Sequence, residues 1–163
     1  MKRWIALFLA IVLAFSFAAC SSNGGNSEEV KTIDIQEFTT SAIQEYTFRD
    51  EMLEIDEEVI AKQYKLGDHQ DKITAMSVWV SASGAMVDEI ALFEFDTAEN
   101  AKKAEEIAIS RKDSLEKKFK DYIPDEVQQL DTARYTVKGN YLLFVISPDS
   151  AKIEDAFNQA VAK

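Results

Sequence analysis

Hydrophobic and polar positions recur along this chain with two different spacings, and the first is the spacing of helices. Between residues 32 and 46 apolar side chains recur every three or four positions, which predicts a helix that Asp34 can cap. A second helix is expected to begin after Asp56 as its N-cap and to run to about Tyr64. We expect Gly67 to end this second helix.

The second spacing is the two-residue period of strands, and it predicts a hairpin in the middle of the chain. Residues 72–81 and 87–95 form its arms, around a turn in which Gly84 is free to take a positive φ. The alternation divides the first arm into two faces, with Met76, Val78 and Val80 on one and Ile73, Ala75 and Trp79 on the other. Residues 49–55, which precede the second helix, are expected to be a short extended or irregular piece.

A second hairpin is predicted nearer the C-terminus. Its arms are residues 133–138 and 141–146, and Gly139-Asn140 between them fits a two-residue hairpin loop. Residues 141–146 are apolar on both faces, which is typical of a central strand covered from both sides. The first arm carries Arg134 and Thr136 on one side, so we expect it to lie at an edge of the sheet.

Helical spacing returns between and after the hairpins. The longest predicted helix runs from Thr97, its N-cap, to about Tyr122, with an inner stripe of Ala101, Ala104, Ala108, Leu115, Phe119 and Tyr122. Pro124 opens a short helix that reaches about Leu130. After Ser147-Pro148 a last helix carries Ile153, Phe157, Ala160 and Val161 on one face.

This order of elements predicts an α+β fold, because hairpins placed between helices favour an antiparallel sheet. We expect a four-stranded antiparallel sheet made from the two hairpins. The long central helix and the C-terminal helix are expected to pack on one face of this sheet. The short N-terminal helices are expected to cover part of the other face.

The first twenty residues have the three parts of an export signal. Lys2 and Arg3 precede an apolar run that ends in Phe17-Ala18-Ala19-Cys20, and Cys20 is the only cysteine of the chain. The pattern resembles a bacterial lipoprotein signal, in which Phe17 stands where Leu is usual. We expect residues 1–19 to be the signal peptide and Cys20 to carry the lipid. The alternative is an uncleaved transmembrane helix, because residues 4–20 are close to the shortest length that spans a bilayer.

Composition agrees with a domain held outside the cytoplasmic membrane. Residues 20–31 are expected to be the lipidated cysteine and a flexible linker, and residues 32–163 a single extracytoplasmic domain. The chain of 163 residues has a formal charge of −11; without Lys2 and Arg3, 16 basic and 29 acidic residues remain, which gives −13. Such acidity argues against a nucleic-acid partner, which would need a basic face.

Few residues suggest chemistry. Asp88 and Glu89 could serve acid–base catalysis, but neighbours in a strand point to opposite faces, so we expect one of them to face solvent. Ser83 and Gly84 form the preceding turn, and together these four residues are the weak candidates for a ligand or partner site. His69 is expected to be a surface residue. The acidic residues between 50 and 58 lack the spacing of a calcium loop, so no metal or cofactor is predicted.

Several stretches resemble an uncharacterised family of small lipoproteins from Gram-positive bacteria, a domain of unknown function. They are residues 81–85 with 88–93, residues 119–124 and residues 138–146, and the similarity extends from about Glu57 to the C-terminus. The resemblance implies one lipid-anchored domain. It supplies no activity, ligand or site residue that could be transferred to this chain.

The sequence therefore favours a non-enzymatic lipoprotein, anchored by Cys20 to the outer face of the cytoplasmic membrane. Its partners would be the membrane, through the lipid, and an envelope protein or a small solute. Two alternatives stay open. One is a carboxylate-dependent hydrolase that acts on envelope material through Asp88 or Glu89, and the other is a purely structural envelope-assembly lipoprotein.

Overall fold

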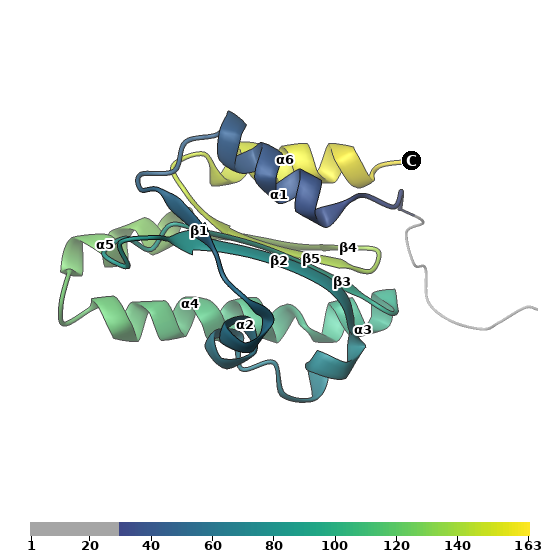
Figure 1. Cartoon of the computed structure of the whole chain (residues 1–163), viewed down its shortest axis with the longest axis horizontal. Helices are drawn as coiled ribbons and strands as arrows, with labels where there is room; N and C mark the ends of the chain where they lie inside the picture. Colours follow the sequence, from purple (N-terminus) through teal and green to yellow (C-terminus); the bar gives the residue numbers. More distant parts are fainter. Residues whose placement is uncertain (1–29) are drawn as a thin grey trace, which may run out of the picture.

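A five-stranded antiparallel sheet forms the middle layer of the domain (Figure 1). The computed structural model describes residues 30–163. In chain order the strands are β1 (Met52–Glu54), β2 (Ile73–Ser81), β3 (Glu89–Phe95), β4 (Arg134–Lys138) and β5 (Tyr141–Ile146), and in the sheet they lie in the order β1-β2-β3-β5-β4. Both predicted hairpins are confirmed, and β3 pairs with β5 to join them. All six residues of β5 are buried, and β4 lies at an edge, as predicted.

The prediction of four strands was wrong by one. Residues 52–54, inside the piece that was expected to be extended or irregular, form β1 and pair with β2, with Met52 opposite Ser81 and Glu54 opposite Trp79. A strand of three residues is too short to show a period of its own. β1 forms because the edge of β2 that does not pair with β3 offers it hydrogen-bonding partners.

The faces of β2 also differ from the prediction at one residue. Met76, Val78 and Val80 share a face, but Ile73 lies with them rather than with Ala75 and Trp79. The register shifts between Ile73 and Ala75, which pair with neighbouring residues of β3. An extra residue in one strand is a β-bulge, and it reverses the direction of every side chain before it.

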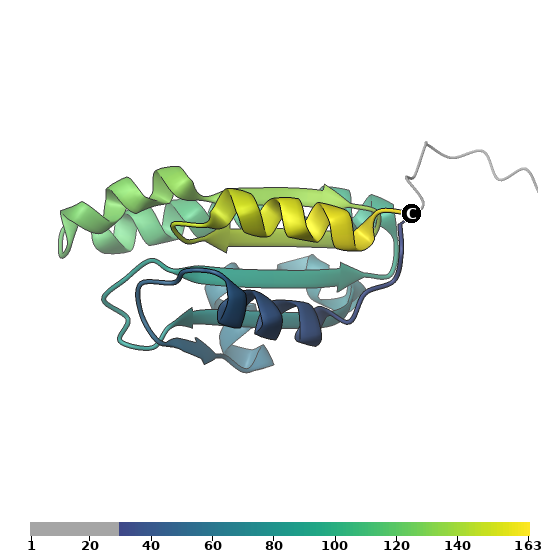
Figure 2. The same ribbon diagram turned by 90° about the horizontal axis from the view of Figure 1, so that it is seen from above.

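The two largest helices lie on opposite faces of the sheet, which corrects the prediction that they share one (Figure 1). One face carries α2 (Glu57–Tyr64), α3 (Ala98–Lys103), α4 (Glu105–Phe119) and α5 (Pro124–Gln129). The other carries α1 (Ile35–Glu45), over β2 and β3, and α6 (Ser150–Val161), over β4 and β5 (Figure 2). The reason is β5 itself: Leu142 and Phe144 point to one core and Leu143 and Val145 to the other, so each face needs a cover.

The predicted long helix is two helices. Thr97 caps α3 as expected, but Ala104, with ψ of −2°, separates α3 from α4. The helix also ends earlier than predicted, at Phe119, and Tyr122 is 87% exposed instead of belonging to the inner stripe. The other members of the predicted stripe, Ala101, Ala104, Ala108, Leu115 and Phe119, are buried as predicted.

The N-terminal helices begin where the predicted caps stand. Asp34 accepts a hydrogen bond from the backbone of Glu37, and Asp56 accepts one from the backbone of Val59. At the end of α2 the left-handed residue is Lys65, with φ of 52°, so the prediction that Gly67 ends the helix is wrong by two positions. Short 3₁₀ helices follow at η1 (Gly67–Lys72) and η2 (Leu130–Thr132).

The described chain begins and ends at the same end of the domain (Figure 1). The backbone N–H of Lys31 donates to the carbonyl of Val161, and the side chain of Val30 packs on Gly139 in the β4–β5 turn. The predicted signal peptide, Cys20 and most of the predicted linker lie outside the described residues. Within residues 30–163 no helix combines the length and the apolar character needed to cross a bilayer.

Candidate functional site

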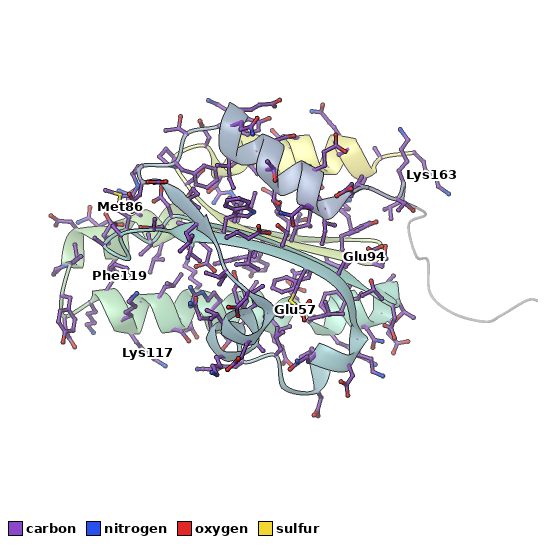
Figure 3. All side chains as sticks on the ribbon, viewed as in Figure 1. Glu57, Met86, Glu94, Lys117, Phe119 and Lys163 are labelled. Carbon is purple, nitrogen blue, oxygen red and sulfur yellow. The ribbon has the colours of Figure 1, made fainter. Side chains whose placement is uncertain are left out.

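The four candidate residues lie at the opposite end of the domain, around the β2–β3 turn. Figure 3 shows Met86 of this turn and Phe119 of α4 at that end, far from Lys163. Asp88 and Glu89 are both buried, each with only 1% of its surface exposed. The expectation that one of them faces solvent is therefore wrong, because the sheet has helices or loops over both of its faces here.

Glu89 points into the α4 side of the core, on the face of β3 that carries Ala91 and Phe93. Arg111 of α4 donates two hydrogen bonds to its carboxylate, with Nε 2.9 Å from Oε1 and Nη2 2.6 Å from Oε2. The hydroxyl of Tyr64 in α2 donates to the same carboxylate, and the guanidinium of Arg111 lies over the Tyr64 ring at 5.2 Å. One carboxylate thus joins β3 to two helices.

Burial and the charge of Glu89 together set the pKa values of Tyr64 and Arg111. Burial raises the pKa of Tyr64 well above its ordinary value, and the neighbouring charge of Glu89 raises it further, so the hydroxyl stays protonated and donates. Burial alone would lower the pKa of Arg111, but the charge and hydrogen bonds of Glu89, with Tyr64, raise it by more. The cluster is a neutral phenol beside a fixed ion pair.

Asp88 is held by a second arginine. It accepts hydrogen bonds from the backbone N of Arg49 at 2.6 Å and from its Nε at 2.8 Å, and Nη2 also donates to it. The outer edge of the same guanidinium meets Glu126 of α5, with Nη1 2.8 Å from Oε1 and Nη2 2.9 Å from Oε2. Glu126 also accepts from the backbone N of Val87 at 3.0 Å, so this network fastens α5 to the start of β3.

The turn itself is tied to the segment before β1. Gly84 has φ of +66°, as predicted for the turn. Asp50 accepts hydrogen bonds from the hydroxyls of Ser81 and Ser83 and from the backbone N of Ser83. These bonds lower the pKa of Asp50 to about 2, first through Ser81 and then through Ser83. Asp50 therefore serves the turn and does not act with the other acidic residues between 50 and 58.

A cavity of about 240 Å³ lies between this turn and α4. Ser83, Gly84, Asp88 and Glu89 all line it, so the structure brings the four candidates together. The α4 wall contributes Arg111, Leu115, Lys118 and Phe119, and the remaining lining comes from Gln63, Val80, Ser81, Ala82, Met86 and Val87.

The basic residues of this cavity were not predicted from the sequence. One signal for Arg111 was available: it occupies a helical position in line with Ala104, Ala108 and Leu115, where a charge is out of place unless it has a buried partner. Arg49 and Lys118 carried no comparable signal. Arg49 matters because its partners Asp88 and Glu126 are distant in the sequence, and Lys118 because α4 packs beside the β2–β3 turn.

The chemistry available here is binding more than proton transfer. A general base must reach substrate, but Glu89 is enclosed by Arg111 and Tyr64, and Asp88 by Arg49. A serine nucleophile needs a base beside it, and the carboxylate that meets Ser83 belongs to Asp50, whose pKa of about 2 makes it a weak one.

The remaining sequence candidates lie elsewhere. His69 is half-buried in η1, and its Nε2 lies 2.9 Å from Oε1 of Glu106 in α4. This contact connects η1 to α4 and gives His69 a structural role. Among residues 30–163 no three histidine, cysteine or acidic side chains converge in a way that could hold a metal ion.

Fold and site together define a three-layer α+β domain with a small polar cavity at one end of its sheet. Residues 44–147 match the family described as "Domain of unknown function (DUF4358)", and the chain belongs to this family. The match begins earlier than the resemblance seen in the sequence and includes β1 and every residue that lines the cavity. No curated protein and no solved structure matches the chain.

Proposed function

We propose that this protein is a non-enzymatic lipoprotein of the Gram-positive type, held by acylated Cys20 on the outer face of the cytoplasmic membrane. Its folded domain binds an envelope protein or a small solute at the end that carries the β2–β3 turn. The supports are the leader at residues 1–20, the arrangement of the two ends of the domain and the state of the candidate carboxylates.

The arrangement of the two ends carries the proposal. Val30, where the described chain begins, packs on the β4–β5 turn, and Lys31 pairs with the end of α6. The cavity lies at the opposite end of the sheet, where Met86 and Phe119 are found (Figure 3). A tether that precedes Val30 would hold the first end towards the membrane and leave the cavity directed away from it.

The state of the carboxylates favours binding over the alternative of a carboxylate-dependent hydrolase. Asp88 and Glu89 each share their oxygens with an arginine in the interior. Carboxylates that are paired with arginine and enclosed hold a fold together, whereas an acid–base catalyst has to exchange a proton with its substrate. The proposed function therefore assigns no catalytic role to either residue.

The charge of the chain supports the same arrangement. With −13 left after removal of the leader, an acidic domain is repelled by anionic lipid headgroups. It would remain soluble at a distance from the bilayer, attached by its lipid alone.

The anchor is tested by fractionation of cells that express the full chain. Cys20→Ala should move the protein from the membrane fraction to the medium, because the thiol that accepts the lipid is gone. Ser22→Ala, two residues further along, is the matched control and should stay in the membrane. Membrane retention of Cys20→Ala would favour the uncleaved transmembrane helix and contradict the proposal.

The binding end is tested by capture from envelope extract with the full chain in detergent. Met86→Asp places a charge at the cavity end, and Gln159→Glu places one on α6 at the other end. We expect Met86→Asp to lose the captured component and Gln159→Glu to keep it. Equal capture by both variants would contradict the placement of the binding surface.

A further inference from the structure

The α4 wall of the cavity presents positive charge. Arg111 gives Nε and Nη2 to Glu89, and the same residue lines the cavity. Lys118 lies two helical turns further along the same face of α4, with Leu115 between them. Two basic residues therefore line the same wall, and Lys118 is exposed.

The wall formed by the turn presents acceptors. The hydroxyls of Ser81 and Ser83 both give their protons to Asp50. A hydroxyl carries one proton and two lone pairs, so a serine that donates to a carboxylate can meet a further group only as an acceptor. The low pKa of Asp50 supports this arrangement, since a carboxylate at neutral pH has no proton to return.

Size and charge limit what these walls can hold. At about 240 Å³ the cavity lies below the roughly 300–1,000 Å³ of sites for drug-sized ligands. Two acidic residues, Asp88 and Glu89, balance the two basic ones, Arg111 and Lys118, in its lining. A ligand with one negative charge suits this balance better than a dianion, and Leu115 and Phe119 provide apolar surface for a small hydrocarbon part.

We infer that the cavity binds a compact carboxylate whose neighbouring carbon bears an N–H donor, which is the chemistry shared by a free α-amino acid and the C-terminal residue of a peptide. The carboxylate would meet the guanidinium of Arg111 and the ammonium of Lys118, as charge-assisted hydrogen bonds favour. The N–H would meet the oxygens of Ser81 and Ser83. The inference deepens the proposed function, on which it rests, by naming the class of ligand.

The probes are four small molecules, titrated by calorimetry into the full chain in detergent micelles. N-acetylalanine represents a peptide C-terminus, alanine a free amino acid, propionate the carboxylate without the N–H, and inorganic phosphate a rival anion. We expect N-acetylalanine or alanine to bind at least about tenfold more tightly than propionate, and the tighter of the two identifies the source. Equal binding of propionate, tighter binding of phosphate, or no saturable binding of any probe would overturn the inference.

Variants test where the probe binds. Lys118→Ala should weaken binding of the preferred probe by about tenfold, because it removes one of two cationic contacts. Lys117→Ala removes the same charge from the adjacent exposed residue, which does not line the cavity, and should change binding less than twofold. Both side chains are exposed, so both variants should fold, which circular dichroism checks. Equal effects of the two substitutions would place the probe elsewhere and overturn the inference.

A separate variant tests the acceptor wall. Ser83→Ala should reduce the ratio between the affinities for the preferred probe and for propionate, since one of the two contacts to the N–H is lost. A preserved difference would contradict the role of the serine. These results are independent of the fractionation and capture experiments: a failed titration leaves the anchor and the binding end standing, and a failed capture leaves the ligand measured.

Discussion

Arg111 and Glu89 form a bidentate ion pair between α4 and β3, with 2.6 Å between Nη2 and Oε2. The side chains are only 11% and 2% exposed, so neither charge can be satisfied by water if its partner is removed. Both residues line the candidate cavity, and the pair connects the helix layer to the centre of the sheet. Loss of this pair should lower the free energy of unfolding more than it lowers the affinity for a ligand.

We predict that Arg111→Met destabilises the protein by about 3–5 kcal/mol, because it leaves a buried carboxylate without its partner. The double variant Arg111→Met with Glu89→Leu should recover most of this loss, since no buried charge remains. Urea unfolding measures both. As a control, Lys62→Ala breaks the exposed pair with Glu58 and should cost less than about 1 kcal/mol. A double variant as unstable as the single one would show that the ion pair itself, and not the orphaned charge, holds the layers together.

Arg49 should not tolerate replacement by lysine. The planar guanidinium reaches Asp88 with one edge and Glu126 with the other, and an ammonium group cannot reproduce both contacts. We expect Arg49→Lys to lower the free energy of unfolding by about 1.5–3 kcal/mol, the range for one lost charged hydrogen bond. Arg134→Lys, at a more exposed arginine of the edge strand, should stay within about 0.5 kcal/mol in the same urea titration. Similar values for both variants would contradict the bridging role.

The two turn glycines should differ in their response to alanine. Gly84 and Gly139 both have positive φ, of +66° and +55°, so alanine at either site should cost about 1–2 kcal/mol for the backbone alone. A Cβ at Gly84 meets open space, but one at Gly139 would come 2.3 Å from Cγ2 of Val30. Gly139→Ala should therefore be the more destabilising in thermal unfolding. Val30→Ala in the Gly139→Ala background should remove the clash and the difference, and a difference that persists would show that Val30 is not the cause.

Asp50 should titrate far below an ordinary aspartate. Its pKa is about 2 in the folded protein against 3.8 ordinarily, because the folded state stabilises the charged form through Ser81 and Ser83. The stability that this provides is complete above pH 3.8 and is lost as the pH falls towards 2. NMR titration of Ser83→Ala should show a higher pKa for Asp50. Asp149, also lowered to about 2 but by Lys152 and Thr47, is the internal control and should not move.

Local chemistry was sufficient to predict the elements and their ends. Aspartates at positions 34 and 56 and Thr97 cap helices because each accepts a backbone hydrogen bond three residues on, wherever the helix later packs. Gly84 and Gly139 mark turns because their positive φ suits glycine. The unbroken apolar run 141–146 predicted a strand covered on both faces, and the structure agrees.

The arrangement of the layers depended on contacts between distant residues. Apolar runs show that β5 needs two covers, yet they do not say which helix takes which face, since α4 and α6 each have an apolar stripe that fits either. The pairing of β1, the bulge before Ala75 and the interruption at Ala104 are likewise decided by neighbours in space.

The candidate site divides in the same way. Ser83, Gly84, Asp88 and Glu89 were singled out because they follow one another along a turn and the strand after it, and all four line one cavity. Their partners, Asp50, Arg49 and Arg111, are 22 to 39 residues away in the chain. A charge in a sequence has no assigned partner, because Coulomb attraction and hydrogen bonding act through space. Only the folded chain could decide that these carboxylates form structural ion pairs and that Arg111 and Lys118 line the same cavity.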